Sequence, residues 1–437
     1  MRFARLCAFA GWLWAGLAAA AETPIVFVHG NGDHAGLWQT VIWRFEANGY
    51  DPGRLFAIDF PHPLARSDDT KPQPGRSSTE EQRGQLAAFV AEVKRRTGAD
   101  KVALVGNSRG GNSIRNYVKN GGAAHVSHVV LGGAVNHGVF AASANTGSEF
   151  NGAGEFMTRL NAGPDEVAAG VAFLTLRSDS NDKYAQPEGR FIGQAGRPTG
   201  ISYDAPALKG ATNEVLPGLD HREVAYHWLA FERSYRFIVG RAPERLDIPD
   251  VERPILDGMV QGMPGGQPSN LPLAGAQVAV FAVDPATGQR LGPAVHAKTT
   301  AADGRWGPFA ARSDAYYEFV VAAPGEAVTH IYRTPFPRSA LYVNLRPGRL
   351  AEADKSAGSV VTITRPRGYF GHGRDRFTLD GQVPPGINEG VPGASTGTVR
   401  LPSGPLRGLK AEFNDERLTV LSWPAAENRV VFAEFHH

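Results

Sequence analysis

Short apolar runs alternate with amphipathic segments from residue 24 to about residue 240. The clearest amphipathic segment is 86–96, where Leu86, Phe89, Val90 and Val93 form one apolar stripe and charged residues fill the opposite face. A last helix is predicted over 228–239. The apolar runs predicted as strands are 25–28, 55–58, 102–105, 126–131 and 171–176. Strands that alternate with helices are typical of a parallel, doubly wound sheet, so this half is predicted to be an α/β domain over 22–242.

The pattern changes near Gly240, where a proline-rich linker begins. Beyond it the helical periodicity stops, and short runs alternate apolar and polar positions instead. The runs predicted as strands are 277–281, 316–320, 340–345, 359–364, 397–401 and 429–432. Gly, Pro and Asp turn signals separate them, which is typical of a β-sandwich or barrel. The sequence therefore predicts an all-β region of two units, 255–345 and 346–437, with the option of one shared core.

The first 21 residues have the organisation of a cleavable signal peptide. Arg2 and Arg5 give a positive start, an apolar stretch follows over 6–17, and small residues over 18–21 form a cleavage region. The apolar stretch is too short for a membrane anchor. The single cysteine, Cys7, lies within this segment, so the mature chain is predicted to have no disulfide and no thiol chemistry. These features predict a secreted or periplasmic protein.

The charge balance excludes one class of partner. Lysine and arginine total 45 against 43 aspartates and glutamates, for a formal net charge of +2. A nucleic-acid-binding protein would carry a clear basic excess, so no nucleic-acid partner is expected. No stretch after the signal segment is apolar enough to span a membrane, so no transmembrane anchor is expected either.

A G-x-S-x-G motif occupies residues 106–110 and places Ser108 between an apolar run and a predicted helix at 112–119. Strand, sharp turn and helix are the context of a nucleophile elbow, in which flanking glycines permit a strained turn that exposes the serine hydroxyl. The sequence therefore predicts Ser108 as a nucleophile.

A second motif, His29-Gly30-Asn31-Gly32, ends the first apolar run. A serine hydrolase needs two backbone N–H groups aimed at the oxygen that becomes negative in the tetrahedral intermediate. We expect one from Arg109, the residue after the nucleophile, and the other from this loop at Asn31.

The remaining pair is an acid and a base, which follow the serine in that order in this type of site. Asp179 and Asp182 both lie in the loop after the run 171–176. Asp182 is favoured because the loop needs a few residues to turn back, but the residue pattern leaves both open. His221, in a polar loop before the last helix, is the predicted base. His137 precedes the acid, and His227 is predicted to lie within the helix.

Four segments taken together (29–32, 106–111, 133–138 and 220–221) resemble the secreted bacterial lipases and esterases of the α/β-hydrolase superfamily. The segment 330–341 is similar to one in an archaeal lipase whose hydrolase head is followed by a C-terminal β-barrel lipid-binding domain. The resemblance implies an ester or lipid substrate and a C-terminal region that engages long acyl chains. Many of these lipases have His where this chain has Asn107. The polar segment 59–79 lacks the amphipathic helix of an interfacial lid, and 139–163 is the candidate cap.

The predicted function is carboxylic ester hydrolysis through a Ser108, His221 and Asp182 acyl-enzyme mechanism, which requires no metal or organic cofactor. An alternative is depolymerisation of an insoluble polyester, with the β region binding the polymer surface. The size of the acyl pocket would separate these two. Another alternative is a non-catalytic surface-binding protein with a hydrolase-like head, because fold alone does not establish catalysis.

Overall fold

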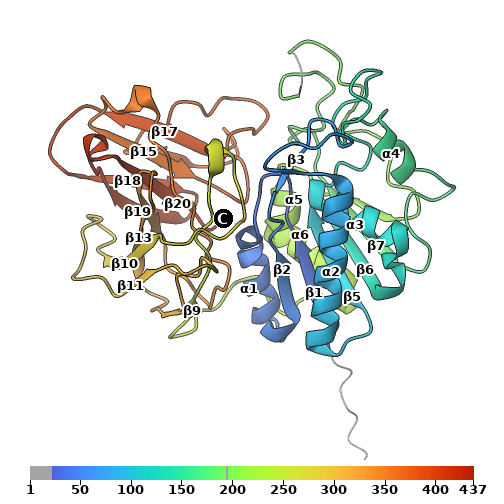
Figure 1. Cartoon of the computed structure of the whole chain (residues 1–437), viewed down its shortest axis with the longest axis horizontal. Helices are drawn as coiled ribbons and strands as arrows, with labels where there is room; N and C mark the ends of the chain where they lie inside the picture. The colour runs from blue at the N-terminus through green and yellow to red at the C-terminus, as the bar shows by residue number, and fades with distance from the viewer. Residues whose placement is uncertain (1–21, 193–194) are drawn as a thin grey trace, which may run out of the picture.

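The computed structural model describes residues 22–192 and 195–437. The predicted signal segment, 1–21, lies outside the described residues. Figure 1 shows two parts side by side, an α/β part in blue to lime on the right and a β part in yellow to red on the left. This arrangement confirms the predicted fold class, an α/β-hydrolase sheet followed by an all-β region.

The α/β part is built on a six-stranded parallel sheet with the order β2-β1-β5-β6-β7-β8. Its strands are β1 (Ile25–Val28), β2 (Leu55–Ile58), β5 (Val102–Asn107), β6 (Val126–Gly132), β7 (Ala172–Arg177) and β8 (Thr212–Val215). All five predicted strands are present. The edge strand β8 escaped prediction because its sequence, TNEV, has no apolar run. A two-stranded pair, β3 (Leu64–Ala65) and β4 (Arg76–Ser77), lies in the loop after β2.

Helices cover both faces of this sheet. They are α1 (Gln39–Ala47), α2 (Thr79–Thr97), α3 (Arg109–Tyr117), α4 (Glu155–Leu160), α5 (Glu223–Tyr226) and α6 (Trp228–Val239). α6 has the predicted bounds. α2 begins earlier than the apolar stripe suggests, because Ser78 and Glu81 form a capping box that starts the helix at Thr79.

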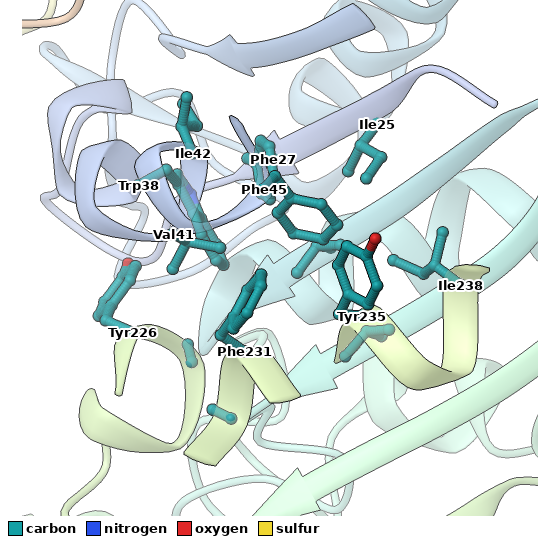
Figure 2. Close-up of a cluster of buried hydrophobic side chains, with 14 of the residues drawn as sticks. Ile25, Phe27, Trp38, Val41, Ile42, Phe45, Tyr226, Phe231, Tyr235 and Ile238 are labelled. Atoms are coloured by element: carbon teal, nitrogen blue, oxygen red, sulfur yellow. The ribbon is translucent and has the colours of Figure 1, made fainter. Parts of the chain in front are cut away.

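The alternation of side chains along β1 divides the core into two clusters. Ile25 and Phe27 face α1 and α6, whereas Val26 and Val28 face α2 and α3. Figure 2 shows the first cluster, in which the Phe45 ring lies between the two helices, 5.2 Å from the Phe231 ring centroid. Packing on both faces fixes the sheet, and therefore the strand ends that carry the site.

The β part contains a seven-stranded sheet with the order β11-β10-β13-β14-β20-β15-β17. The strands of the whole region are β9 (Ile255–Leu256), β10 (Gln277–Val283), β11 (His296–Thr299), β12 (Phe309–Ala310), β13 (Tyr316–Ala322), β14 (Val328–Arg333), β15 (Ser359–Thr364), β16 (Phe377–Leu379), β17 (Thr396–Leu401), β18 (Gly408–Phe413), β19 (Glu416–Leu421) and β20 (Arg429–Glu434). β14 pairs with β20 in parallel, so strand pairing crosses the predicted boundary between 255–345 and 346–437. Two apolar clusters, one containing Trp306 and the other Phe370, pack against this shared sheet.

The segment predicted as a strand over 340–345 forms isolated bridges instead, at Ala340 and Leu345. Its side chains divide between the two parts: Ala340, Val343 and Leu345 belong to the apolar core of the β part, whereas Tyr342 and Asn344 reach the α/β part. The Tyr342 hydroxyl accepts a hydrogen bond from the Ala57 N–H at 3.1 Å, and the Asn344 amide donates to Asp59 at 3.0 Å. The segment therefore packs into the core of the β part with one set of side chains and contacts the α/β part with the other. Among the described residues, no helix has both the length and the apolar character to cross a membrane.

Candidate active site

Ser108 lies at the turn between β5 and α3, as the motif predicts. Its backbone adopts φ 52° and ψ −124°, a strained conformation for a residue with a side chain. Glycine is required on both sides of it. A Cβ on Gly110 would collide with the Val28 carbonyl oxygen, and a Cβ on Gly106 would lie 2.6 Å from Ile114 Cδ1. The elbow is therefore closed by direct approach of neighbouring backbone and side chains.

The side chain of Arg109 anchors the elbow to the surrounding loops. It is fully buried and forms an ion pair with Glu149 at 2.6 Å. It also donates to the Ser77 hydroxyl at 3.0 Å and to the Pro63 carbonyl at 3.1 Å. Burial raises the pKa of Glu149, and the Arg109 charge opposes that shift. Because the side chain is fixed in this way, the Arg109 backbone N–H keeps a fixed place at the start of α3.

The loop after β1 lies beside the elbow. The Asn31 side chain accepts a hydrogen bond from the Ala65 N–H at 2.7 Å, and the Gly32 N–H donates to Pro63 at 3.1 Å. Within 22–192 and 195–437, no hydrogen bond is seen from the Asn31 backbone N–H. His29 has a structural role, because its Nε2 accepts from the Phe60 N–H at 3.1 Å and burial lowers its pKa.

The structure brings His221 and Asp182 together. His221 Nδ1 is 2.9 Å from Asp182 Oδ2, and the second Asp182 oxygen accepts from the Tyr184 N–H at 2.8 Å. Asp179 points elsewhere and accepts from the N–H groups of Asn181 and Gly218. His221 Nε2 is buried and has no hydrogen-bond partner in the described part of the chain. Of the two aspartates left open by the sequence, Asp182 is the one that contacts the histidine.

The other two histidines considered are placed differently. His137 faces Glu166, with its Nε2 3.1 Å from the carboxylate. His227 lies outside α6 and caps it, with its Nδ1 accepting from the Leu229 N–H. Burial, reinforced by nearby arginines, lowers the pKa of His227 to about 4, so this side chain is neutral at pH 7.

A cavity of about 160 Å³ contains both Ser108 and His221. Val139 and Phe150 also line it, and both belong to the segment predicted as a cap. The full lining comprises Asn31, Asp33, Asn107, Ser108, Val135, Val139, Phe150, Tyr184, Ile192, His221, Arg222 and Tyr369. Arg222 and Asp33 form an ion pair of 2.7 Å, which balances the charge in this lining. The remaining wall is largely apolar or aromatic.

The sequence prediction assigns no role to two residues of this site. Asn107, where many lipases have His, donates to the Gly132 carbonyl at 2.9 Å and to the His221 carbonyl at 3.3 Å, which ties the elbow to the histidine loop. Tyr369 enters the cavity from the C-terminal region. The sequence marks the segment around Tyr369 only by its many arginines over 365–376. The hydrophobic pattern does not indicate that this segment lies next to the site.

The parallel sheet, the elbow serine and the histidine–carboxylate pair at the strand ends define a protein of the α/β-hydrolase class. The family model described as Lipase (class 2) matches residues 22–172, and the model described as Lipase C-terminal domain matches residues 255–350. The chain is therefore an α/β hydrolase of the lipase/esterase class.

Several solved structures are similar to about half of the chain. Aspergillus fumigatus lipase B is 16% identical over 53% of this chain and 56% of its own, with a TM-score of 0.35. A Paleococcus ferrophilus monoacylglycerol lipase is 17% identical over 50% of this chain and 96% of its own, with a TM-score of 0.35. Bacillus licheniformis lipase BlEst2 is 20% identical over 50% and 93%, also with a TM-score of 0.35.

Proposed function

We propose that this protein is a secreted carboxylic ester hydrolase that works through an acyl-enzyme. Ser108 attacks the ester carbonyl carbon while His221 Nε2 takes the hydroxyl proton. Asp182 holds the imidazole with its Nδ1 protonated, which leaves Nε2 free to accept. The observation that carries the proposal is the 2.9 Å contact between His221 Nδ1 and Asp182. The other ring nitrogen of His221, Nε2, has no hydrogen-bond partner among the described residues, and His221 lines the same cavity as Ser108.

The negative oxygen of the tetrahedral intermediate needs fixed donors. The backbone N–H groups of Asn31 and Arg109 are proposed for this role, which the anchoring of both side chains supports. Collapse of the intermediate breaks the ester C–O bond, and His221 returns its proton to the leaving alcohol. Water, deprotonated by His221, then attacks the acyl-enzyme and releases the carboxylic acid and free Ser108.

The cavity favours a small acyl group. Its volume of about 160 Å³ is below the roughly 300–1,000 Å³ of sites that enclose drug-sized ligands. Val135, Val139, Phe150 and Ile192 provide an apolar wall for a hydrocarbon chain. We therefore expect short or medium acyl esters to be the better substrates. Engagement of a lipid or polymer surface by the C-terminal region stays a prediction.

The test is hydrolysis of p-nitrophenyl esters from short to long acyl chains by the wild type, Ser108→Ala and Ser127→Ala. Ser127 is a matched control in β6, where its hydroxyl contacts the Val102 carbonyl and the His128 ring, away from the site. Ser108→Ala should lower kcat by at least about 10⁴-fold, because the nucleophile is removed and only binding and oxyanion stabilisation remain. Ser127→Ala should keep wild-type activity. Full activity of Ser108→Ala, or no ester hydrolysis by the wild type, would refute the proposal.

A further inference from the structure

The loop that carries His221 is held from the C-terminal region. Asp220 and Glu223 flank the histidine, and both are buried. Asp220 Oδ2 accepts from the Tyr369 N–H at 2.6 Å and from Arg374 at 3.2 Å. Its other oxygen accepts from the N–H groups of Arg222 and Glu223 at the start of α5. The Asp220 carboxylate therefore joins the histidine loop of the α/β part to Tyr369 and Arg374 of the C-terminal region.

Glu223 extends the same connection. It forms an ion pair with Arg365 and a second one with Arg374, at 2.7 Å in the latter case. Arg365 and Arg374 each donate to the Tyr369 carbonyl at 2.6 Å. The two arginines thus bind the histidine loop on one side and the backbone beside the Tyr369 ring on the other.

The loop that carries Asp182 reaches the same segment. Lys183 lies 3.9 Å from the centroid of the Tyr369 ring, and its Nζ donates to the Gly393 carbonyl at 2.8 Å. Arg222, next to His221, lies 5.5 Å from the same ring. Tyr369 therefore contacts the neighbours of both the acid and the base while its side chain lines the cavity.

Electrostatics makes the arginines necessary for this geometry. Asp220 and Glu223 are two buried carboxylates close together, and like charges in such a place repel strongly. Arg365 and Arg374 compensate them, and removing one partner of a buried pair leaves an uncompensated charge that must move or bind a proton. The class 2 lipase model matches residues 22–172, and the lipase C-terminal domain model matches residues 255–350. Neither match includes the histidine loop or the segment 365–374.

We propose that the segment 365–374 is part of the active site. Arg365 and Arg374 are positioning residues that hold the His221 loop in register with Ser108. Tyr369 is a specificity-determining residue that limits the size of the group the cavity accepts. This inference rests on the ester hydrolase function proposed above, and its first test includes a readout that does not depend on turnover.

The first test compares Arg374→Gln, Arg374→Lys and the control Arg400→Gln in the full chain. Arg400, on β17, pairs with Asp354 and contacts neither loop of the site within the described part of the chain. Arg374→Gln should lower kcat by about 10- to 100-fold with KM changed less than about 3-fold, because a displaced base slows chemistry more than binding. Arg374→Lys should recover part of that loss, and Arg400→Gln should match the wild type.

Proton NMR reads the same displacement without substrate. The Nδ1–H of His221 bonded to Asp182 should give a downfield signal in the wild type, assigned by its loss in Asp182→Asn. The signal should be retained in Arg400→Gln and broadened or lost in Arg374→Gln. Thermal unfolding checks that each variant is folded. If Arg374→Gln does not fold, Arg374→Lys decides the question, because a retained charge with changed geometry should still weaken the signal and lower kcat.

The second test uses Tyr369→Ala and Tyr369→Phe with esters of increasing acyl length. Loss of the ring should lower KM for long-chain esters by at least about 10-fold relative to short ones, whereas Tyr369→Phe should keep the wild-type profile. Wild-type kcat and NMR signal in Arg374→Gln would overturn the positioning role, and an unchanged length profile in Tyr369→Ala would overturn the specificity role. A wild type without esterase activity would refute the proposed function and the specificity role together, while the NMR comparison would still decide positioning.

Discussion

The two sides of the candidate site are held in different ways. The nucleophile side, which comprises β5, the Ser108 elbow and α3, is fixed by Arg109 through Glu149, Ser77 and Pro63, all within the α/β part. The acid–base side comprises the loops 178–186 and 218–223, and it is held by residues of the segment 365–374. The contacts of Arg109 on the nucleophile side thus all lie within the first 150 residues, whereas the acid–base side depends on the end of the chain.

The difference follows from where each group sits in the fold. Ser108 is at the centre of the sheet, between two packed faces, so glycines and one buried arginine suffice to close the turn. Asp182 and His221 are on loops after the outer strands β7 and β8, where less of the α/β part surrounds them. A loop near a sheet edge needs an external contact to keep one geometry, and the β part supplies it here.

The largest effect is expected on the acid–base side, from Asp182→Asn. An amide can hold His221 in the wrong tautomer, so kcat should fall by about 10⁴-fold while stability changes little. The matched control is Asp179→Asn in the same loop, whose carboxylate contacts backbone N–H groups and not His221. Steady-state kinetics on one short-chain ester checks both variants. A larger loss in Asp179→Asn than in Asp182→Asn would reverse the assignment of the acid.

On the nucleophile side, Arg109→Met should act on stability first. The substitution leaves Glu149 buried without its partner, which costs about 3–5 kcal/mol of the free energy of unfolding. The double variant Arg109→Met with Glu149→Leu removes both charges, so it should recover most of that loss. Urea unfolding monitored by circular dichroism measures the difference. Equal destabilisation in the single and double variants would show that the ion pair is not what anchors the elbow.

Gly110→Ala tests the close packing of the nucleophile side, whereas Arg109→Met tests its buried ion pair. The added methyl group would meet the Val28 carbonyl oxygen and force the backbone to shift, at a cost of about 2–3 kcal/mol. Gly84→Ala is the matched control, since Gly84 lies in α2 with no atom within 4 Å of an added Cβ. That variant should be more stable than the wild type by about 0.5–1 kcal/mol. Thermal unfolding of the pair distinguishes the two positions, and equal shifts would contradict close packing at the elbow.

The two sides also differ in how far the sequence predicts them. Ser108 follows from a local pattern of strand, glycine turn and helix, because every constraint on it lies within a few residues. His221 and the loop of Asp182 follow from the order of elements. The choice between Asp179 and Asp182 depends on the direction of each side chain, which no periodicity reports. Tyr369, Arg365 and Arg374 were not predicted, because their contacts depend on how the two parts of the molecule dock.

The strands likewise differ in how well their local sequence pattern predicts them. Buried parallel strands were predicted from their continuous apolar runs, whereas β8 was missed because it is polar. The segment 340–345 has the alternation of a strand, but its backbone forms only isolated bridges. Val343 and Leu345 pack into the core of the β part, whereas Tyr342 contacts the α/β part. The parallel pairing of β14 with β20 joins distant segments, and alternation along either strand does not identify its partner.

A pH dependence of about the same size as the Gly110→Ala effect is expected on the acid–base side, from Lys183 beside Asp182. Burial and the nearby Arg222 lower the pKa of Lys183 from 10.5 to about 8. The folded state therefore favours the neutral amine, so the contribution of Lys183 to stability is complete above pH 10.5 and is lost as the pH falls through about 8. Relative to Lys183→Met, the wild type should lose about 2–3 kcal/mol of unfolding free energy between pH 10.5 and 7.5. Lys101→Met, at an exposed lysine, should show no such difference, and a flat Lys183 profile would mean that this loop is open to solvent.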